Sequence, residues 1–61
     1  MKRQHLLKYL TKYNCELARE GGRHSIWRNK TTGDMTAIPR HNEVKDFLAI
    51  KICKDLGIAK P

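Results

Sequence analysis

Apolar and aromatic residues recur at helical spacing near the start of the chain. Four of them follow the i, i+3, i+4, i+7 spacing of one helix face: Leu6, Tyr9, Leu10 and Tyr13. This spacing predicts a helix over residues 4–13 with one buried stripe. Asn14 follows, and asparagine tolerates the left-handed backbone conformation in which many helices end. We therefore expect the first helix to stop there.

The middle of the chain alternates between apolar and polar residues, as strands with one buried face do. Three such segments are expected, over residues 15–19, 23–28 and 35–38. Gly21-Gly22 forms a tight turn after the first strand, and a turn-rich hairpin loop follows the second. Pro39 has no N–H to donate to a neighbouring strand, so it closes the third.

The second of these strands has two different faces. Ile26 shares one face with His24 and Arg28, whereas Ser25 and Trp27 share the other. Only one of the two faces should be buried when one side of a sheet stays open. We expect the buried residue to be Ile26 rather than Trp27.

A second helix is expected near the end of the chain. Asn42 suits the N-cap, and Glu43 suits the first turn, where a carboxylate meets the positive end of the helix dipole. Apolar residues then continue at helical spacing: Val44, Phe47, Leu48, Ile50, Ile52, Cys53 and Leu56. Gly57 is expected to end this helix.

These elements predict one α+β domain over residues 1–61, in the order helix, three-stranded antiparallel meander, helix. A meander this small cannot cover its own apolar face, so both helices should pack on one side of it. The opposite face then stays open to solvent or to a partner.

The chain is strongly basic, since 13 Lys and Arg residues against 6 Asp and Glu residues give a net charge of +7. This excess of positive charge destabilises the folded state through repulsion between like charges, and it favours a polyanionic partner. Nucleic acid is the first candidate and an acidic protein the second. No apolar run approaches the ~20 residues of a membrane span, and the N-terminus lacks a signal-peptide core, so we expect a cytoplasmic protein.

Cysteine and histidine residues do not form a recognisable metal motif. Cys15 and Cys53 are expected to be buried thiols without a disulfide, because a reducing compartment disfavours one. No pair among these cysteines, His24 and His41 has the short spacing of structural zinc ligands. The chain also lacks an acidic cluster for magnesium. We therefore expect no metal and no other cofactor.

The turn at Gly21-Gly22 is followed by Arg23 and then by His24. Histidine is the side chain whose unperturbed pKa lets it exchange a proton near neutral pH. Beside RNA it is a candidate general base, since it can take the proton of the 2′-hydroxyl that attacks the neighbouring phosphate. Arg23, Arg28 and Arg40 are the cations expected to contact that phosphate and stabilise its developing charge. The alternative is that His24 is a packed or surface residue without chemistry.

Three further residues each have more than one interpretation. Trp27 is either a platform on which an RNA base stacks or a packed core residue. His41 follows Pro39-Arg40, and it is expected to cap or hydrogen-bond at the entrance of the second helix, with a second proton carrier as the alternative. His5 is expected to be solvated only.

Several features of the chain resemble the HicA toxins, also called the YcfA-like family. They are the order of the elements, the histidine of Gly22-Arg23-His24, and Ile38-Pro39-Arg40-His41 before a terminal helix whose end, residues 51–58, also looks like that family. The similarity covers nearly the whole chain. It implies a fold like that of double-stranded-RNA-binding domains. It also implies a ribosome-independent endoribonuclease, an mRNA interferase, that cleaves mRNA and halts growth.

The resemblance implies a partner and a site as well. The partner is a HicB antitoxin that binds and masks the toxin. The family's catalytic histidine, in a Gly-Ser-His or Gly-Thr-His motif, falls on His24, and this places Gly22 among the residues at the RNA. Arg23 stands where the family has a small hydroxyl residue. Either activity is reduced in consequence, or Arg23 supplies a phosphate contact of its own.

Cleavage by this chemistry needs no metal and leaves a 2′,3′-cyclic phosphate or its hydrolysis product. A rival interpretation is a non-catalytic RNA-binding module that uses the same basic surface. A pair of DNA-contacting helices is disfavoured, because helix-turn-helix recognition needs two helices joined by a short turn and here a meander lies between them.

Overall fold

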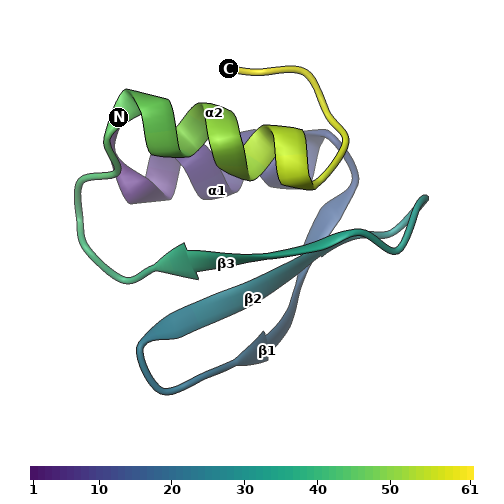
Figure 1. Ribbon diagram of the computed structural model, residues 1–61, viewed down its shortest axis with the longest axis horizontal. Coiled ribbons are helices and arrows are strands. Elements are labelled where there is room, and N and C mark those ends of the chain that lie inside the picture. The colour runs from purple at the N-terminus through teal and green to yellow at the C-terminus, as the bar shows by residue number, and fades with distance from the viewer.

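The computed structural model describes all residues, 1–61, and shows two helices with three strands between them (Figure 1). The elements are α1 (Arg3–Lys12), β1 (Cys15–Glu20), β2 (His24–Asn29), β3 (Met35–Pro39) and α2 (Asp46–Asp55). The expected order is confirmed, and the first four elements lie within one residue of their expected bounds. Asn14 has a φ of 68°, so it ends the α1 segment in the left-handed conformation expected from its side chain.

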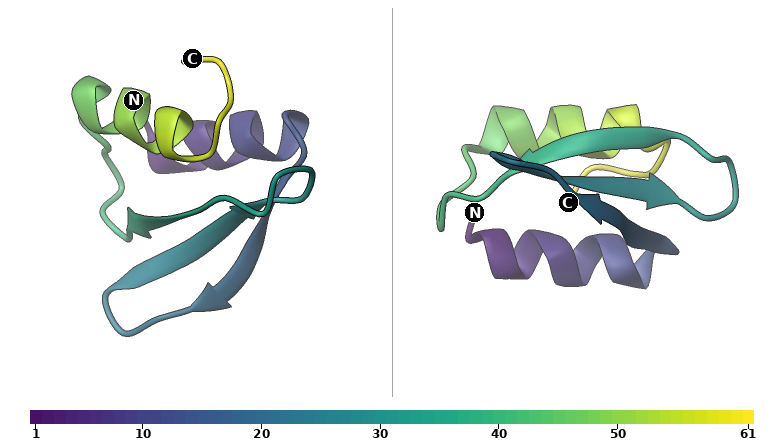
Figure 2. Two further views of the ribbon diagram at one scale, coloured as in Figure 1. Left: turned by 45° about the vertical axis from the view of Figure 1, so that its right-hand side comes forward. Right: turned by 90° about the horizontal axis from the view of Figure 1, so that it is seen from below.

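The three strands form one antiparallel sheet in the order β1-β2-β3. Both helices lie on the same side of this sheet, α1 against β1 and α2 against β3 (Figure 1, Figure 2). This is the α+β arrangement that the sequence predicted, and it leaves the other face of the sheet uncovered. Neither helix has the length and apolar character that crossing a membrane would require.

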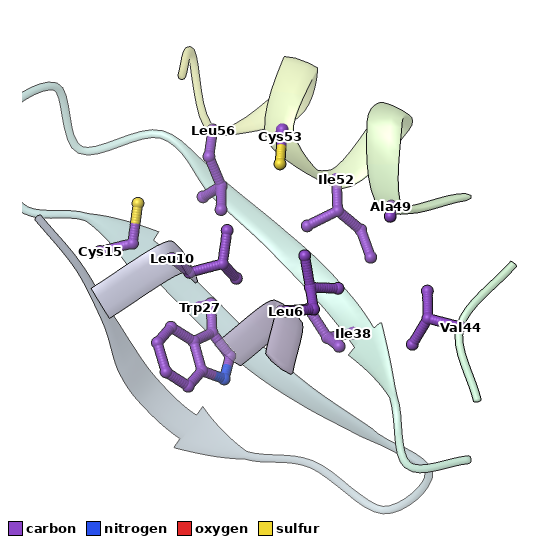
Figure 3. Close-up of a cluster of buried hydrophobic side chains, with 10 residues drawn as sticks. All are labelled: Leu6, Leu10, Cys15, Trp27, Ile38, Val44, Ala49, Ile52, Cys53 and Leu56. Atoms are coloured by element: carbon purple, nitrogen blue, oxygen red, sulfur yellow. The ribbon is translucent and has the colours of Figure 1, made fainter. Parts of the chain in front are cut away.

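The core lies between the sheet and the helices (Figure 3). Its ten buried residues are Leu6, Leu10, Cys15, Trp27, Ile38, Val44, Ala49, Ile52, Cys53 and Leu56. The cysteines are both free, and the burial that surrounds them raises the pKa of each thiol.

Trp27 is 8% exposed, whereas Ile26 is only half-buried, so the expectation that Ile26 would be the buried residue was wrong. The helix-facing side of β2 carries Ser25, Trp27 and Asn29, and the open side carries His24, Ile26 and Arg28. In a core this small the indole supplies the largest apolar area available, which favours its burial.

α2 begins later than the sequence predicted, and Asn42 is not its N-cap. Lys45 occupies that position, with no side-chain capping bond. The preceding residues pair instead with the N-terminus of the chain. The amide of Arg3 donates to the Asn42 carbonyl at 2.8 Å, the amide of Val44 donates to the Met1 carbonyl at 2.8 Å, and Lys2 forms a β-bridge with Glu43. Because this pairing keeps the backbone extended, the helix starts at Asp46.

The apolar stripe of α2 is also narrower than expected. Its buried face consists of Ala49, Ile52, Cys53 and Leu56. Phe47 is 69% exposed and Ile50 is 44% exposed, so both lie on the outer side of the helix. The apolar residues of this segment were too many for one helix face, and only the tertiary contacts select which of them are covered.

Candidate functional site

A surface depression lies where β2 begins and β3 ends. Its lining residues are Gly22, Arg23, His24, Pro39, Arg40 and His41. Two segments that are distant in the sequence meet there, because the register of the sheet pairs His24 with Pro39. The β1–β2 turn and the exit from β3 therefore form opposite sides of one site.

His24 is exposed in this depression. It is the first residue of β2, and strand alternation places it on the open face of the sheet with Ile26 and Arg28. The glycine turn thus presents the imidazole to solvent rather than to the core. The position is compatible with contact between this ring and a large substrate such as RNA.

The glycine turn before His24 is closed by hydrogen bonds. The amide of Gly21 donates to the His24 carbonyl at 2.8 Å. A Cβ on Gly21 would lie 3.0 Å from that carbonyl oxygen, so a larger residue would require the carbonyl to shift by a few tenths of an ångström. Glycine at position 21 lets the turn close against the start of β2 without that shift.

Arg40 closes the same turn from the opposite strand. Its guanidinium donates to the Gly22 carbonyl at 3.0 Å, to the Gly21 carbonyl, and to Glu20 Oε1 at 2.9 Å. Sequence reasoning expected Arg40 to contact phosphate. The structure brings it to the site but directs its donors at the protein's own turn.

Glu20 and Ser25 connect Arg40 to further hydrogen bonds near the depression. The Ser25 hydroxyl donates to Glu20 Oε1 at 2.6 Å, and Arg3 donates to Ser25 Oγ at 2.9 Å and to the Pro39 carbonyl at 2.9 Å. The Ser25 bond, followed by the contact with Arg40, lowers the pKa of the Glu20 carboxyl from its ordinary value. These bonds join α1 and all three strands at the end of the sheet that carries His24.

Sequence reasoning missed Arg3, Glu20 and Ser25 as supporting residues. A serine on the buried face of a strand must find hydrogen-bond partners, but Ser25 was expected on the open face with Trp27, so this signal was not recognised. Ser25 is 1% exposed and has two such partners. The identity of those partners was not readable from sequence, since Arg3 lies in a different element.

The remaining candidate cations differ in their surroundings. Arg28 donates to Glu16 Oε2 at 2.7 Å across the open face, and this bond lowers the pKa of the Glu16 carboxyl. Arg23 is exposed beside His24 and forms no side-chain hydrogen bond or ion pair. Arg23 is therefore the guanidinium of this site whose donors are all available to a ligand.

Two other expectations change with the structure. The indole of Trp27 lies in the core, so it offers no exposed ring face on which a base could stack. His41 is exposed and its imidazole forms no hydrogen bond, so the capping role expected for it is not found. Instead it lines the same depression as His24. His5 is exposed on α1 and does not line this depression.

The zinc-ligand residue types are not brought together. Cys15 and Cys53 lie in the core, whereas His24 and His41 lie at the surface. No group of three His, Cys, Asp or Glu side chains gathers in a way that could hold a metal ion.

Comparison with known proteins agrees with the resemblance seen in the sequence. A family model described as the HicA toxin of bacterial toxin–antitoxin systems matches residues 3–58, which is nearly the whole chain. No curated protein and no solved structure gave a match. The matched segment includes both helices, the three strands and every residue that lines the depression. The chain belongs to the HicA toxin family.

Proposed function

We propose that this toxin is a metal-independent endoribonuclease, an mRNA interferase, and that His24 is its general base. The observation that carries the proposal is the placement of His24. Its imidazole is exposed in a surface depression beside the guanidinium of Arg23, in a chain whose net charge is +7. A basic surface attracts the RNA backbone, and the depression brings one titratable ring to it.

The chemistry needs little more than this arrangement, because RNA carries its own nucleophile. The neutral His24 imidazole takes the proton of a 2′-hydroxyl, and the oxygen attacks the adjacent phosphorus to give a 2′,3′-cyclic phosphate. Such proton transfer contributes about 10²–10⁴-fold in rate. The negative charge that builds up on the phosphate oxygens is stabilised by Arg23, which has no partner within the protein.

Arg23 takes the place of the family's small hydroxyl residue, and we assign it the phosphate contact. Gly22 lies beside it, and apart from its two chain neighbours no residue has an atom within 4 Å of the position its Cβ would occupy, so the turn leaves space for a phosphate to approach. Arg28 lies farther along the open face of β2 and forms an ion pair with Glu16. We assign it a contact with the RNA backbone beside the cleaved phosphate rather than with the reacting phosphate itself.

The toxin–antitoxin family implies a protein partner, and we propose a HicB-type antitoxin. It would cover the depression that contains His24 or block the path of RNA into it. Acidic residues on its surface would accelerate association with a toxin of this charge. Purifying the complex and assaying RNA cleavage at saturating antitoxin tests the masking. Full activity in the saturated complex would contradict it.

The rival function is RNA binding without cleavage, and substitution of His24 separates the two. We expect His24→Ala to slow cleavage of single-stranded RNA by about 10²–10⁴-fold while RNA affinity stays within a few-fold of wild type. His5→Ala is the matched control, since it removes an exposed histidine outside the depression. If wild type binds RNA but neither wild type nor variant cuts it, the binding module is the right function.

The proposal that cleavage needs no metal ion is tested separately. Wild type should cleave at an unchanged rate in excess EDTA and should produce 2′,3′-cyclic phosphate ends. Complete loss of cleavage in EDTA, restored by a divalent cation, would refute metal independence while leaving the nuclease itself in place.

A further inference from the structure

RNA cleavage by attack of the 2′-oxygen requires two proton transfers. One removes the proton of the nucleophile, which the proposed function assigns to His24. The other concerns the departing 5′-oxygen, which is a poor leaving group unless it receives a proton as its bond to phosphorus breaks. A positioned acid typically contributes about 10²–10⁴-fold to such a step.

A second imidazole lies in the depression that contains His24. It belongs to His41, two residues beyond the strand partner of His24. Pro39 is that partner, and the Arg40 side chain turns back toward the glycine turn and Glu20. The chain leaves β3 after Pro39, and His41 then lines the same concave surface as His24.

The residues on both sides of His41 are held by contacts with the start of the chain. Before it, the Pro39 carbonyl accepts a hydrogen bond from Arg3 at 2.9 Å. After it, the Asn42 carbonyl accepts a hydrogen bond from the Arg3 amide at 2.8 Å, and Glu43 forms a β-bridge with Lys2. The segment is therefore fixed to the first turn of α1. The backbone at His41 is thus fixed in position, and its exposed imidazole can rotate about the side-chain bonds to reach a bound substrate.

The imidazole of His41 is also free to react. It is exposed and forms no hydrogen bond, so no protein group occupies its nitrogen atoms. Arg23, Arg40 and His24 are the other titratable groups that line the depression, and none of them is an acid able to donate near neutral pH when His24 acts as base. Histidine is the residue type suited to that task.

We infer that His41 is the general acid for the cleavage in which His24 is the base; this inference rests on the proposed function. The bond between the 2′-oxygen and phosphorus forms, and the 2′-hydroxyl proton moves to His24. The bond between phosphorus and the 5′-oxygen breaks, its electron pair stays on that oxygen, and the His41 imidazolium gives it a proton. The products are a 2′,3′-cyclic phosphate and a 5′-hydroxyl. Solvent then returns both rings to their starting protonation states, so no co-reactant is needed.

The test replaces the leaving oxygen by sulfur. An oligoribonucleotide with one bridging 5′-phosphorothiolate releases a thiolate, which departs without a proton, so it no longer needs the acid. We expect His41→Ala to cleave ordinary RNA about 10²–10⁴-fold more slowly than wild type, and the phosphorothiolate within a few-fold of wild type. His24→Ala should be slow on both substrates, and His5→Ala should match wild type on both.

Each other outcome has a defined meaning. If His41→Ala cuts ordinary RNA at the wild-type rate, His41 is not the acid and the proposed function stands. If it is equally slow on both substrates, His41 acts in binding or positioning and the inference is overturned. If wild type cuts neither substrate, the nuclease proposal falls and the inference with it. Thermal unfolding checks that each variant is folded, and His41→Gln repeats the comparison with a side chain that retains hydrogen-bonding groups.

Discussion

Arg40 offers the sharpest test of how the site is built. Its guanidinium donates to two carbonyls of the glycine turn and to Glu20, so we expect it to position His24 rather than to bind RNA. Arg40→Ala removes all of these bonds. Arg40→Lys keeps the charge but loses the planar fork that reaches several acceptors at once.

The stability lost in Arg40→Ala depends on how far the Arg40 side chain is exposed to solvent. The Arg40 side chain is 42% exposed, and the ion pair with Glu20 therefore adds little. The two bonds to backbone carbonyls contribute about 1–2 kcal/mol together at this exposure. In a domain of this size that loss lowers the melting temperature by about 5–15 °C. A loosened turn also moves His24 relative to the phosphate, and misplacement of about 1 Å costs up to ~10²-fold in rate.

Arg28→Ala is the matched control for stability, because Arg28 forms an Arg–Glu pair on the same sheet without any bond to backbone. Circular dichroism gives the melting temperatures of the three variants. Their RNA affinities and cleavage rates are measured at two salt concentrations. We expect both Arg40 variants to melt at a lower temperature than Arg28→Ala, and to cleave RNA more slowly than wild type even at saturating RNA. The reasoning fails if Arg40→Ala melts like wild type while its RNA affinity falls and the salt dependence of binding decreases by about one counterion. That result would make Arg40 a phosphate contact.

Two further predictions concern the core and the response to acid. Trp27→Ala should lower the free energy of unfolding by about 3–5 kcal/mol, which approaches the whole stability of a chain this short. Trp27→Phe should stay folded and bind RNA as wild type does. A folded Phe variant without RNA affinity would show that the indole contacts RNA. Because the pKa of Glu20 is lowered on folding, its contribution to stability is present above its ordinary value near 4.5 and is lost as pH falls through the folded pKa. The melting temperatures of wild type and Glu20→Gln should therefore differ most at neutral pH and converge as the pH falls below the folded pKa of Glu20. A difference that stays constant with pH would contradict this.

Local periodicity was sufficient for much of the fold. The i, i+3, i+4 spacing of Leu6, Tyr9 and Leu10 predicted α1, and Asn14 predicted where it ends. Both signals depend only on neighbours in the chain. The alternation around His24 also placed it on one face with Ile26 and Arg28. Family membership was visible in the order of these motifs, and the family match confirmed it.

Other features depended on contacts between distant segments. Alternation divides β2 into two faces but does not say which one the helices cover, so Trp27 and Ile26 could be distinguished only after α1 and α2 were in place. The start of α2 depended on backbone pairing with the N-terminus, more than forty residues away along the chain, against which the capping preference of Asn42 is weak.

The site itself shows the same division. The sequence singled out His24 by the residues beside it, and the match of Gly22-Arg23-His24 to the family's motif added to this. The direction of the Arg40 donors and the presence of His24 and His41 in one depression required the β2–β3 register and the anchoring by Arg3. A residue type and its neighbours specify what a side chain can do chemically. Which other groups it meets depends on how strands and helices pack, because those contacts join parts of the chain that no local pattern connects.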